Sequence, residues 1–373
     1  MTIHSAYVHI PFCVRICTYC DFNKYFIQNQ PVDEYIECLI EEMRSASHQD
    51  LETFYVGGGT PTALSDAQLE RLLKAISSLF NIKGEYTFEA NPDELTETKI
   101  RLLKQYGVNR LSLGVQTFDK ALLKKLGRSH QASDIFKAVN IARDYGIPSI
   151  SLDLMYDLPG QSLGQFQESL KQALALDIDH ISSYGLIVEP QTQFYNLYRK
   201  GKLELPDEDV GQAMYQLLID NIEQSDLHQY EISNFAKEGH ESEHNKVYWK
   251  NEQYYGFGAG ASGYIDNTRY TNVKPVNHYI QKIRDNVLPR LNETTLSRQE
   301  QIEEEMFLGL RMAIGVNKER FKHKFGTTLE TIYSKELEEL EDKGLITNTD
   351  GYVSLTGRGK VIGNEVFEAF IKG

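Results

Sequence analysis

The sequence predicts an α/β fold built on a parallel sheet, and three observations carry this prediction. Six apolar, strand-like runs alternate with amphipathic stretches over the first two hundred residues. Polar and glycine-rich residues follow the ends of these runs, and the alternation stops after Leu186. Successive β/α units imply a parallel sheet with right-handed crossovers. This pattern suits a partial (β/α)6 barrel, and an open doubly wound sheet is also compatible with it.

Amphipathic stretches, with apolar residues at helical spacing, lie between the strand-like runs. In the first of these stretches the spacing extends over residues 35–43. Ser65 with Gln68, and Ser162 with Gln165, form capping-box patterns that mark the starts of two further helices. The six predicted strands are Ala6–Ile10, Thr53–Val56, Tyr86–Ala90, Arg110–Val115, Ser149–Met155 and His180–Leu186.

The rest of the chain has a different pattern. A helix is predicted from Pro206 to about Ser225, because proline suits the first turn and three acidic residues follow it. A short strand is predicted at Gln229–Ile232. From about Leu296 we expect helices at 301–313 and 329–340, a hairpin at 345–355 that turns at Asp350-Gly351, and a last helix after Thr356. These elements predict a winged-helix-like module.

The composition restricts the class of protein. The 373 residues are 41% hydrophobic and 25% charged, which is ordinary for a globular protein. The net charge of −14 argues against binding to nucleic acid, and it favours protein contact or a lid over the barrel as the role of the C-terminal module. We expect no signal peptide and no transmembrane segment. Three of the four cysteines share one loop, which favours a reducing compartment, the cytoplasm.

The loop after the first predicted strand contains Cys13, Cys17 and Cys20 at C-x3-C-x2-C spacing. Three thiolates this close can hold three irons of a [4Fe-4S] cluster and leave the fourth iron open to a small molecule. A structural zinc site is the main alternative, but it needs four ligands. The sequence has no second cysteine pair, so His9 or a distant histidine would have to complete such a site. We read Cys38 as a residue of the core or its boundary.

This motif resembles the signature of the radical S-adenosylmethionine (SAM) family. The run Tyr7-x-His9-Ile10-Pro11-Phe12-Cys13 resembles one branch more closely, which contains oxygen-independent coproporphyrinogen III oxidases and heme chaperones related to them. The resemblance implies a partial (β/α)6 radical-SAM barrel. It also implies that the open iron binds the amino and carboxylate groups of SAM, and that cleavage of SAM would release a 5′-deoxyadenosyl radical.

The polar residues near the strand ends are expected to gather at one edge of the sheet, where such folds bind ligands. Taken singly, each could be an ordinary polar residue of the barrel rim. A zwitterionic ligand with a ribose suits an arginine, acidic acceptors and close backbone contacts. The resemblance implies that eight residues together line the SAM pocket. These residues are Tyr7, Gly58, Gly59, Thr60, Glu89, Gln116, Arg128 and Asp153.

A second unusual stretch contains His244-Asn245-x-x-Tyr248-Trp249, with the only tryptophan in the chain. A histidine beside aromatic residues is commonly a packed or hydrogen-bonded residue. The motif also resembles one associated with heme in the chaperone members of the branch, which implies that His244 is a heme ligand. His240 is a second candidate. A histidine on a flexible loop would allow heme to be held and then released.

Two departures separate the chain from the oxidases of the branch. Those enzymes carry a further cysteine two positions after the triad, where this chain has Phe22, and a longer segment before the cluster motif. We therefore predict a heme chaperone with a [4Fe-4S] cluster, SAM and heme as cofactors. Its expected partners are heme-accepting apo-proteins, respiratory enzymes at the membrane among them, and a homodimer is compatible with the sequence.

The alternatives are an oxygen-independent coproporphyrinogen III oxidase, and a radical SAM methyltransferase or cyclase. The predicted domains are a radical SAM barrel with the cluster at 1–205, a connecting region with the heme motif at 206–296, and the winged-helix-like module at 297–373.

Overall fold

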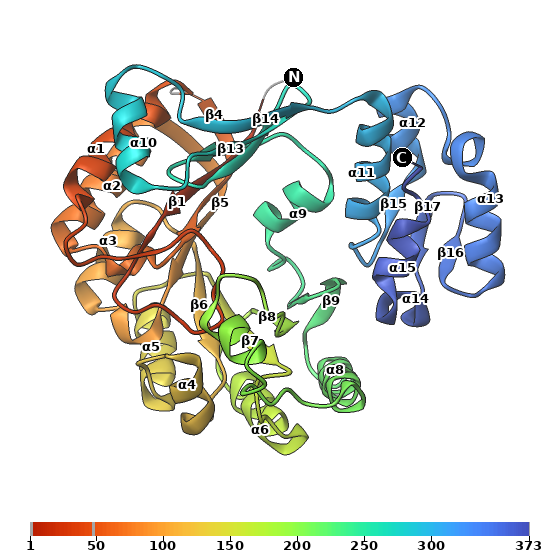
Figure 1. Cartoon of the computed structure of the whole chain (residues 1–373), viewed down its shortest axis with the longest axis horizontal. Coiled ribbons are helices and arrows are strands. Elements are labelled where there is room, and N and C mark those ends of the chain that lie inside the picture. The colour runs from red at the N-terminus through yellow and green to blue at the C-terminus, as the bar shows by residue number, and fades with distance from the viewer. Residues whose placement is uncertain (1–2, 47–48, 373) are drawn as a thin grey trace.

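A computed structural model describes residues 3–46 and 49–372. Its main feature is a curved nine-stranded sheet in the order β11-β1-β4-β5-β6-β7-β8-β10-β9 (Figure 1). The six central strands are parallel and adjacent in chain order, as expected for successive β/α units. They confirm the six predicted strands, and they are β1 (Ser5–Ile10), β4 (Gln49–Gly58), β5 (Phe80–Ala90), β6 (Arg110–Gln116), β7 (Ser149–Tyr156) and β8 (His180–Gly185).

Helices cover the convex side of this sheet (Figure 1). Both predicted capping boxes are present: Ser65 accepts from the backbone N–H of Gln68, and Ser162 from that of Gln165. The apolar faces of the helices pack on the buried sides of the strands in one large core. These helices are α1 (Val32–Arg44), α2 (Asp66–Leu79), α3 (Glu97–Gln105), α4 (Lys120–Leu126), α5 (Ala132–Asp144) and α6 (Leu163–Leu174), with short 3-10 turns at Pro61–Ala63 and Pro92–Glu94.

Residues after β8 extend the sheet at both edges. Strands β9 (His228–Glu231) and β10 (Asn234–Ala236) continue it antiparallel beyond β8, and β11 (Tyr255–Phe257) joins β1 in parallel. Side chains of this region, such as Leu218 and Phe257, lie in the same hydrophobic core as the barrel strands. The predicted strand at 229–232 is therefore present, shifted by one residue.

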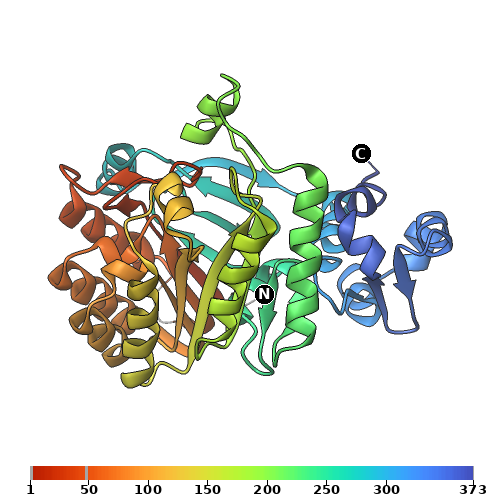
Figure 2. The same cartoon turned by 90° about the horizontal axis from the view of Figure 1, so that it is seen from below.

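Further elements connect the barrel to the last part of the chain. Figure 2 shows α8 between the barrel helices and the C-terminal module, and the segment with α7 projecting from the molecule. The predicted helix after Pro206 is α8, which the structure begins two residues later. These elements are α7 (Gln193–Tyr198), α8 (Glu208–Glu223), α9 (Glu243–Trp249), α10 (Val276–Arg284) and a sheet of β12 (Ser262–Ile265), β13 (Thr268–Asn272) and β14 (Arg290–Thr295). Near the start of the chain, between β1 and α1, the short strands β2 (Phe12–Cys13) and β3 (Tyr25–Phe26) form a separate parallel pair.

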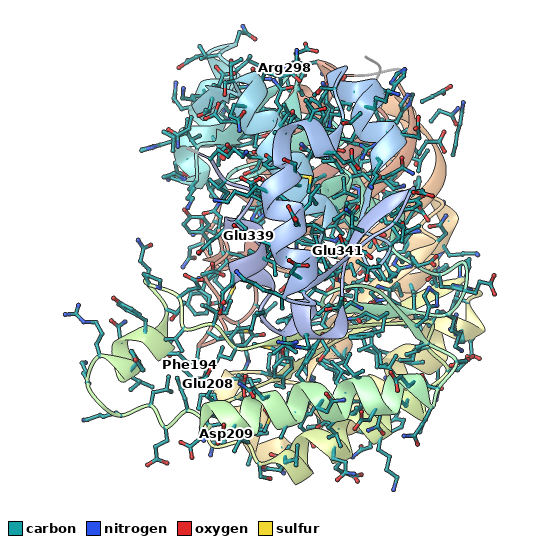
Figure 3. The ribbon with its side chains drawn as sticks, turned by 90° about the vertical axis from the view of Figure 1, so that its right-hand side faces the viewer. Phe194, Glu208, Asp209, Arg298, Glu339 and Glu341 are labelled. Atoms are coloured by element: carbon teal, nitrogen blue, oxygen red, sulfur yellow. The ribbon has the colours of Figure 1, made fainter. Side chains whose placement is uncertain are left out.

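The C-terminal module has a hydrophobic core of its own, formed by residues between Ile302 and Phe370. The predicted hairpin is present, since β16 and β17 pair antiparallel across the Asp350-Gly351 turn. Figure 3 shows Glu339 and Glu341, both exposed, on α13 at the face of the module turned away from the barrel. The elements are α11 (Arg298–Gly309), β15 (Val316–Asn317), α12 (Lys318–Phe325), α13 (Leu329–Asp342), β16 (Ile346–Asn348), β17 (Tyr352–Leu355), α14 (Gly357–Val361) and α15 (Gly363–Glu368).

Together these features confirm the predicted fold class, an α/β barrel followed by a mainly helical C-terminal domain. Over residues 3–46 and 49–372, no helix is both long and apolar enough to cross a membrane.

Candidate functional site

The three clustered cysteines line one cavity of about 260 Å³ at the carboxyl ends of the barrel strands. Cys13 lies in the short strand β2, which follows β1 directly, and Cys17 and Cys20 lie in the loop after it. Thr60 Oγ1 donates to Cys13 Sγ over 3.5 Å, and Arg128 Nη1 donates to Cys17 Sγ over 3.4 Å. The fourth cysteine, Cys38, is buried on α1 within the hydrophobic core. The loop therefore brings together the three thiols that the sequence spacing singles out.

The buried thiols need the positive charge of a metal cluster to stabilise their thiolate forms. Burial raises the pKa of Cys13 to about 12 and that of Cys20 to about 11, so both thiols hold their protons at neutral pH. Metal binding requires thiolates and would release these protons. In the described part of the chain, no three His, Cys, Asp or Glu side chains already form a metal-binding group. The three thiols share a cavity, as the binding of one cluster requires.

The glycine-rich turn after β4 packs tightly beneath this loop. Gly58 has φ +115°, a conformation that favours glycine, and a Cβ there would lie 2.6 Å from the His9 ring. A Cβ on Gly59 would lie 2.9 Å from the carbonyl oxygen of Phe12 and 3.0 Å from Cys13 Sγ. Only glycine lets the backbone approach the cysteine loop this closely, which explains the residue type at both positions.

Glu89, on β5, is held directly beside this turn. Its Oε1 accepts from Tyr55 OH over 2.7 Å, and its Oε2 accepts from the backbone N–H of Gly58 over 3.0 Å. Burial raises the pKa of Glu89 to about 7, while these two hydrogen bonds oppose the rise. Glu89 is thus a fixed acceptor on the wall of the cavity, as a ligand with ribose hydroxyls or an amino group requires.

Gln116 and Asp153, on the next two strands, line the same cavity. Gln116 has φ +68° at an irregularity in the pairing of β6 with β7, and strained backbone of this kind clusters at functional sites. Asp153 Oδ1 accepts from Ser112 Oγ over 3.2 Å, and burial raises the pKa of Asp153 to about 6.

Arg128 supplies the positive charge of the cavity. It follows α4, and its Nη2 donates to Asn91 Oδ1 over 2.8 Å and to the carbonyl oxygen of Gly114. The same guanidinium reaches Cys17, so it lies between the cysteine loop and the strand ends. This position suits the carboxylate of a ligand bound next to the cluster loop.

Seven of the eight residues predicted for SAM binding line this cavity, and Tyr7 does not. In the register of β1 and β4, Tyr7 pairs with Tyr55, whereas Ile10 pairs with Gly58. The Tyr7 hydroxyl is hydrogen-bonded to His9 Nδ1 over 2.9 Å, and the Tyr7 ring centroid lies 6.0 Å from that of Tyr55, which donates to Glu89. Contact between Tyr7 and SAM stays a prediction.

The structure also places residues in the cavity that the sequence analysis did not select. Asn91, after β5, bonds Arg128, and Tyr184, near the end of β8, donates to Gln116 Oε1 over 3.4 Å. Both follow the rule that predicted the others, since they lie at the carboxyl ends of barrel strands. Their residue types alone gave no reason to prefer them over other polar residues at these ends.

His244 lies on a helix, and the expectation of a flexible loop is wrong. Residues 243–249 form α9, which lies on the open side of the sheet and contacts both β4 and α11 (Figure 1). Ser242 caps this helix, and the seven residues are too few to show a clear apolar period. His244 is 1% exposed, and its ring stacks on Tyr55.

Both ring nitrogens of His244 are already hydrogen-bonded. Nδ1 pairs with Thr53 Oγ1, and Nε2 pairs with Tyr248 OH, each over 2.8 Å. Burial lowers the pKa of His244 to about 3, so the ring is neutral. His240, the second candidate, is partly exposed and lies 3.3 Å from Ser149 Oγ through its Nδ1.

Comparison with known proteins identifies the family of this chain. The Radical SAM superfamily profile matches residues 7–173, and the HemN C-terminal domain profile matches residues 296–362. A Bacillus subtilis protein named heme chaperone HemW is 52% identical over 98% of this chain and 99% of its own length. The chain belongs to the HemW family. Proteins of the same name from Lactococcus lactis and Escherichia coli are 45% and 30% identical, over 99% and 98% of this chain and 97% and 98% of their own lengths.

Membership of the HemW family confirms the resemblance drawn from the cysteine motif. Among solved structures, coproporphyrinogen III oxidase (HemN) from Escherichia coli matches this HemW-family chain with a TM-score of 0.86. The match covers 100% of this chain and 91% of the other at 24% identity, so it establishes the shared fold. The HemW relatives align from end to end, so barrel, connecting region and C-terminal module all belong to the similarity.

Proposed function

We propose that this chain is a heme chaperone, which binds heme and delivers it to apo-proteins. The observation that carries the proposal is the 52% identity, over essentially the full length of both chains, to a protein named heme chaperone HemW. Proteins of that name from other bacteria match over the same extent. The C-terminal module and the barrel are thus present together, as in these relatives.

Two short stretches support the proposal within the radical SAM branch. Cys20-Asp21-Phe22 lacks the additional cysteine expected of the oxidases, and the side chain of Phe22 is exposed at the edge of the cavity. His244-Asn245-x-x-Tyr248-Trp249 matches the motif that the resemblance associates with heme.

The cysteine-lined cavity is the proposed site of a [4Fe-4S] cluster and SAM. Cys13, Cys17 and Cys20 would hold the cluster, which would supply an electron to SAM bound at its open iron. Arg128 would receive the carboxylate of SAM, and Glu89 would accept hydrogen bonds from it. The remaining residues proposed to contact SAM are Tyr7, Gly58, Gly59, Thr60, Gln116 and Asp153.

A heme ligand at His244 stays a prediction from the sequence, and the geometry sets a condition on it. The ring is buried and both nitrogens are hydrogen-bonded. Iron could bind His244 only after one ring nitrogen had lost its hydrogen bond to Thr53 or Tyr248 and the buried ring had become accessible. Heme binding at His244 would depend on this rearrangement, whereas heme binding at an exposed site would not.

The recipients of heme are proposed to be respiratory enzymes, which would bring the protein to the membrane through its partners. The cytoplasm as location and the homodimer as assembly are further predictions from the sequence. Heme delivery would be measured as the activity recovered by an apo-enzyme after incubation with the heme-loaded protein.

The proposal is tested anaerobically with the full chain. After cluster reconstitution, heme is titrated and followed by its absorbance, and a parallel sample receives SAM, reductant and coproporphyrinogen III. Stoichiometric heme binding without decarboxylated product supports the chaperone. Formation of protoporphyrinogen would assign the chain to the oxidases. Neither heme binding nor product would direct the search to a methyltransferase or cyclase.

A further inference from the structure

A second cavity, of about 550 Å³, lies between the barrel and the C-terminal module. Its lining residues come from β9 and α9 on the barrel side and from α11 and the segment before β15 on the module side. Figure 1 shows where these elements lie in the fold. We call this cavity the module cleft. We propose that the module cleft is the heme-binding site and that His228 is an axial ligand of the iron. This inference rests on the proposed function and adds the place where heme is held.

The size and lining of the module cleft suit a large flat ligand. Ligand pockets measure roughly 300–1,000 Å³ and are lined mainly by apolar and aromatic side chains. The module cleft falls in this range, whereas the cysteine-lined cavity, at about 260 Å³, is smaller. Its walls include Trp249, Met312, Ile314 and Tyr352. Ile314 is 53% exposed, which is unusual for a large apolar side chain and leaves it available to cover a ligand.

The walls of the module cleft are fixed by backbone hydrogen bonds. Ile232 donates through its N–H to the carbonyl oxygen of Arg311 over 3.1 Å, and Ala313 donates to that of Tyr230 over 2.9 Å. The segment between α11 and β15 thus adds to the edge of the barrel sheet next to β9. A cleft with such walls is preformed, so a ligand need not separate the two parts.

His228 lines the module cleft in a state suited to bind iron. Its side chain is 46% exposed, and its Nε2 lies 3.0 Å from Glu241 Oε1. A carboxylate that accepts from one ring nitrogen orients the imidazole and leaves the lone pair on the other nitrogen. Across residues 3–46 and 49–372, Nδ1 of His228 makes no hydrogen bond. His244, in contrast, is buried and uses both ring nitrogens.

Among the described residues that line the module cleft, one unpaired lysine can receive a propionate of heme. Lys246, Lys250 and Arg320 line it. Lys246 is paired with Glu243 over 2.8 Å, and Arg320 with Glu305 over 2.7 Å. Within the described ranges Lys250 forms no ion pair, so its ammonium group is the cation free to bind a ligand carboxylate.

The residues of the His-Asn-x-x-Tyr-Trp motif lie on two different sides of α9, and one side faces the proposed site. His244 and Tyr248 point toward the barrel interior, where Tyr248 meets the His244 ring edge-on. Trp249 lines the module cleft, with the Arg311 guanidinium 4.6 Å from its ring. The Nε1–H of Trp249 is buried and has no acceptor among the described residues, although buried indoles usually find one. A polar group of a ligand in the module cleft could satisfy it.

The experiment is an anaerobic heme titration of the full chain, followed by the Soret absorbance. The variants are His228→Ala, Lys250→Glu and His244→Ala, and His278→Ala on α10 is the matched control because it is exposed and far from the module cleft. Circular dichroism and the unfolding temperature establish that each variant is folded. Heme dimethyl ester, which lacks the propionate charges, is titrated alongside heme.

We expect His228→Ala to lose the wild-type Soret position and to bind heme about tenfold more weakly or worse, as is typical when a metal site loses such a group. Lys250→Glu should weaken binding of heme and leave binding of the dimethyl ester unchanged. His278→Ala should behave as the wild type. A His228→Ala variant with the wild-type spectrum and affinity would overturn the inference, and so would a folded His244→Ala variant that alone loses heme. Absence of heme binding by the wild type would instead overturn the proposed function.

Discussion

The carboxylate of Glu85, on β5, accepts a hydrogen bond from the backbone N–H of His244 over 3.1 Å. The same carboxylate accepts from the N–H of Glu243 over 2.9 Å and from Ser242 Oγ over 3.1 Å. A negative charge at a helix N-terminus satisfies free N–H groups and complements the helix dipole. Glu85 therefore fixes α9 inside the open side of the barrel and keeps the ring of His244 against Tyr55.

Replacing Glu85 should loosen α9. The variant Glu85→Ala leaves the three donors at the start of α9 and the hydroxyl of Thr87 without their acceptor, and it removes the carboxylate 3.8 Å from the buried Arg110. These losses should lower the free energy of unfolding by about 1–3 kcal/mol. The backbone amides of α9 should also exchange hydrogen faster than those of the barrel strands. Chemical denaturation and hydrogen exchange measure the two effects.

The matched control for this change is Glu238→Ala, because Glu238 is exposed and makes no side-chain hydrogen bond or ion pair in the part of the chain that the structure describes. Unchanged exchange at α9 in the Glu85→Ala variant would show that the helix is held by its packing alone. If heme binds at His244, the loosened helix should bind it more readily, whereas the module cleft should bind it less well.

The cluster assignment predicts a division among the four cysteines. Cys13→Ala, Cys17→Ala and Cys20→Ala should each reduce the iron and sulfide retained after anaerobic reconstitution, because each removes one of the three thiolates. Cys38→Ala should retain the wild-type iron content, since its thiol lies in the core on α1. Iron and sulfide assays and the visible absorbance provide the measurement. Iron retained in all three loop variants would remove the basis for the cluster.

Much of the barrel could be predicted because each β/α unit has a local sequence pattern of its own. Apolar runs gave the six strands, and the capping boxes at Ser65 and Ser162 marked two helices. Their order along the chain determines the order in the sheet. The cavity residues were predictable for a related reason: the carboxyl ends of parallel strands meet at one edge, so polar residues there lie together.

The sequence does not show features that depend on which residues become neighbours in the fold. Tyr7 was predicted to contact SAM, and the register of β1 with β4 places it beside Tyr55, so this contact stays a prediction. The helix α9 was missed because it is only seven residues long, and because Glu85, which accepts from its first backbone N–H groups, lies 159 residues away from His244 in the chain. The module cleft is formed by segments from two parts of the chain, so no local pattern indicates it.

The substitution Gly58→Ala tests how closely the glycine-rich turn after β4 packs against its neighbours. In Gly58→Ala, both the backbone conformation and a Cβ 2.6 Å from the His9 ring should destabilise the fold. Gly107→Ala is the control, because Gly107 has φ +88° and no atom within 4 Å of an added Cβ. The loss of stability in Gly58→Ala should exceed that in Gly107→Ala by about 1–3 kcal/mol. Equal losses in chemical denaturation would mean that the turn can shift to accept a side chain.

Glu42 should make stability depend on pH. Its side chain is buried on α1, where it accepts from Tyr279 OH over 2.6 Å and from the N–H of Gly258 over 2.7 Å. Burial raises its pKa from 4.5 to about 7, and the hydrogen bonds only partly oppose this. The folded protein therefore binds a proton at this site that the unfolded chain has released between about pH 4.5 and pH 7. Its contribution to stability is complete below about pH 4.5 and is lost as the pH rises through about 7.

The measurement compares the free energy of unfolding of the wild type and Glu42→Gln from about pH 5 to pH 8. The comparison is needed because buried neutral histidines, such as His9 and His244, have lowered pKa values and give the opposite slope. Glutamine keeps the shape of the side chain and cannot titrate, so the stability of the wild type relative to the variant should fall by a few kcal/mol across this range. A difference that stays constant or rises with pH would mean that Glu42 is ionised in the folded protein, held by its donors Tyr279, Gly258 and Asn272.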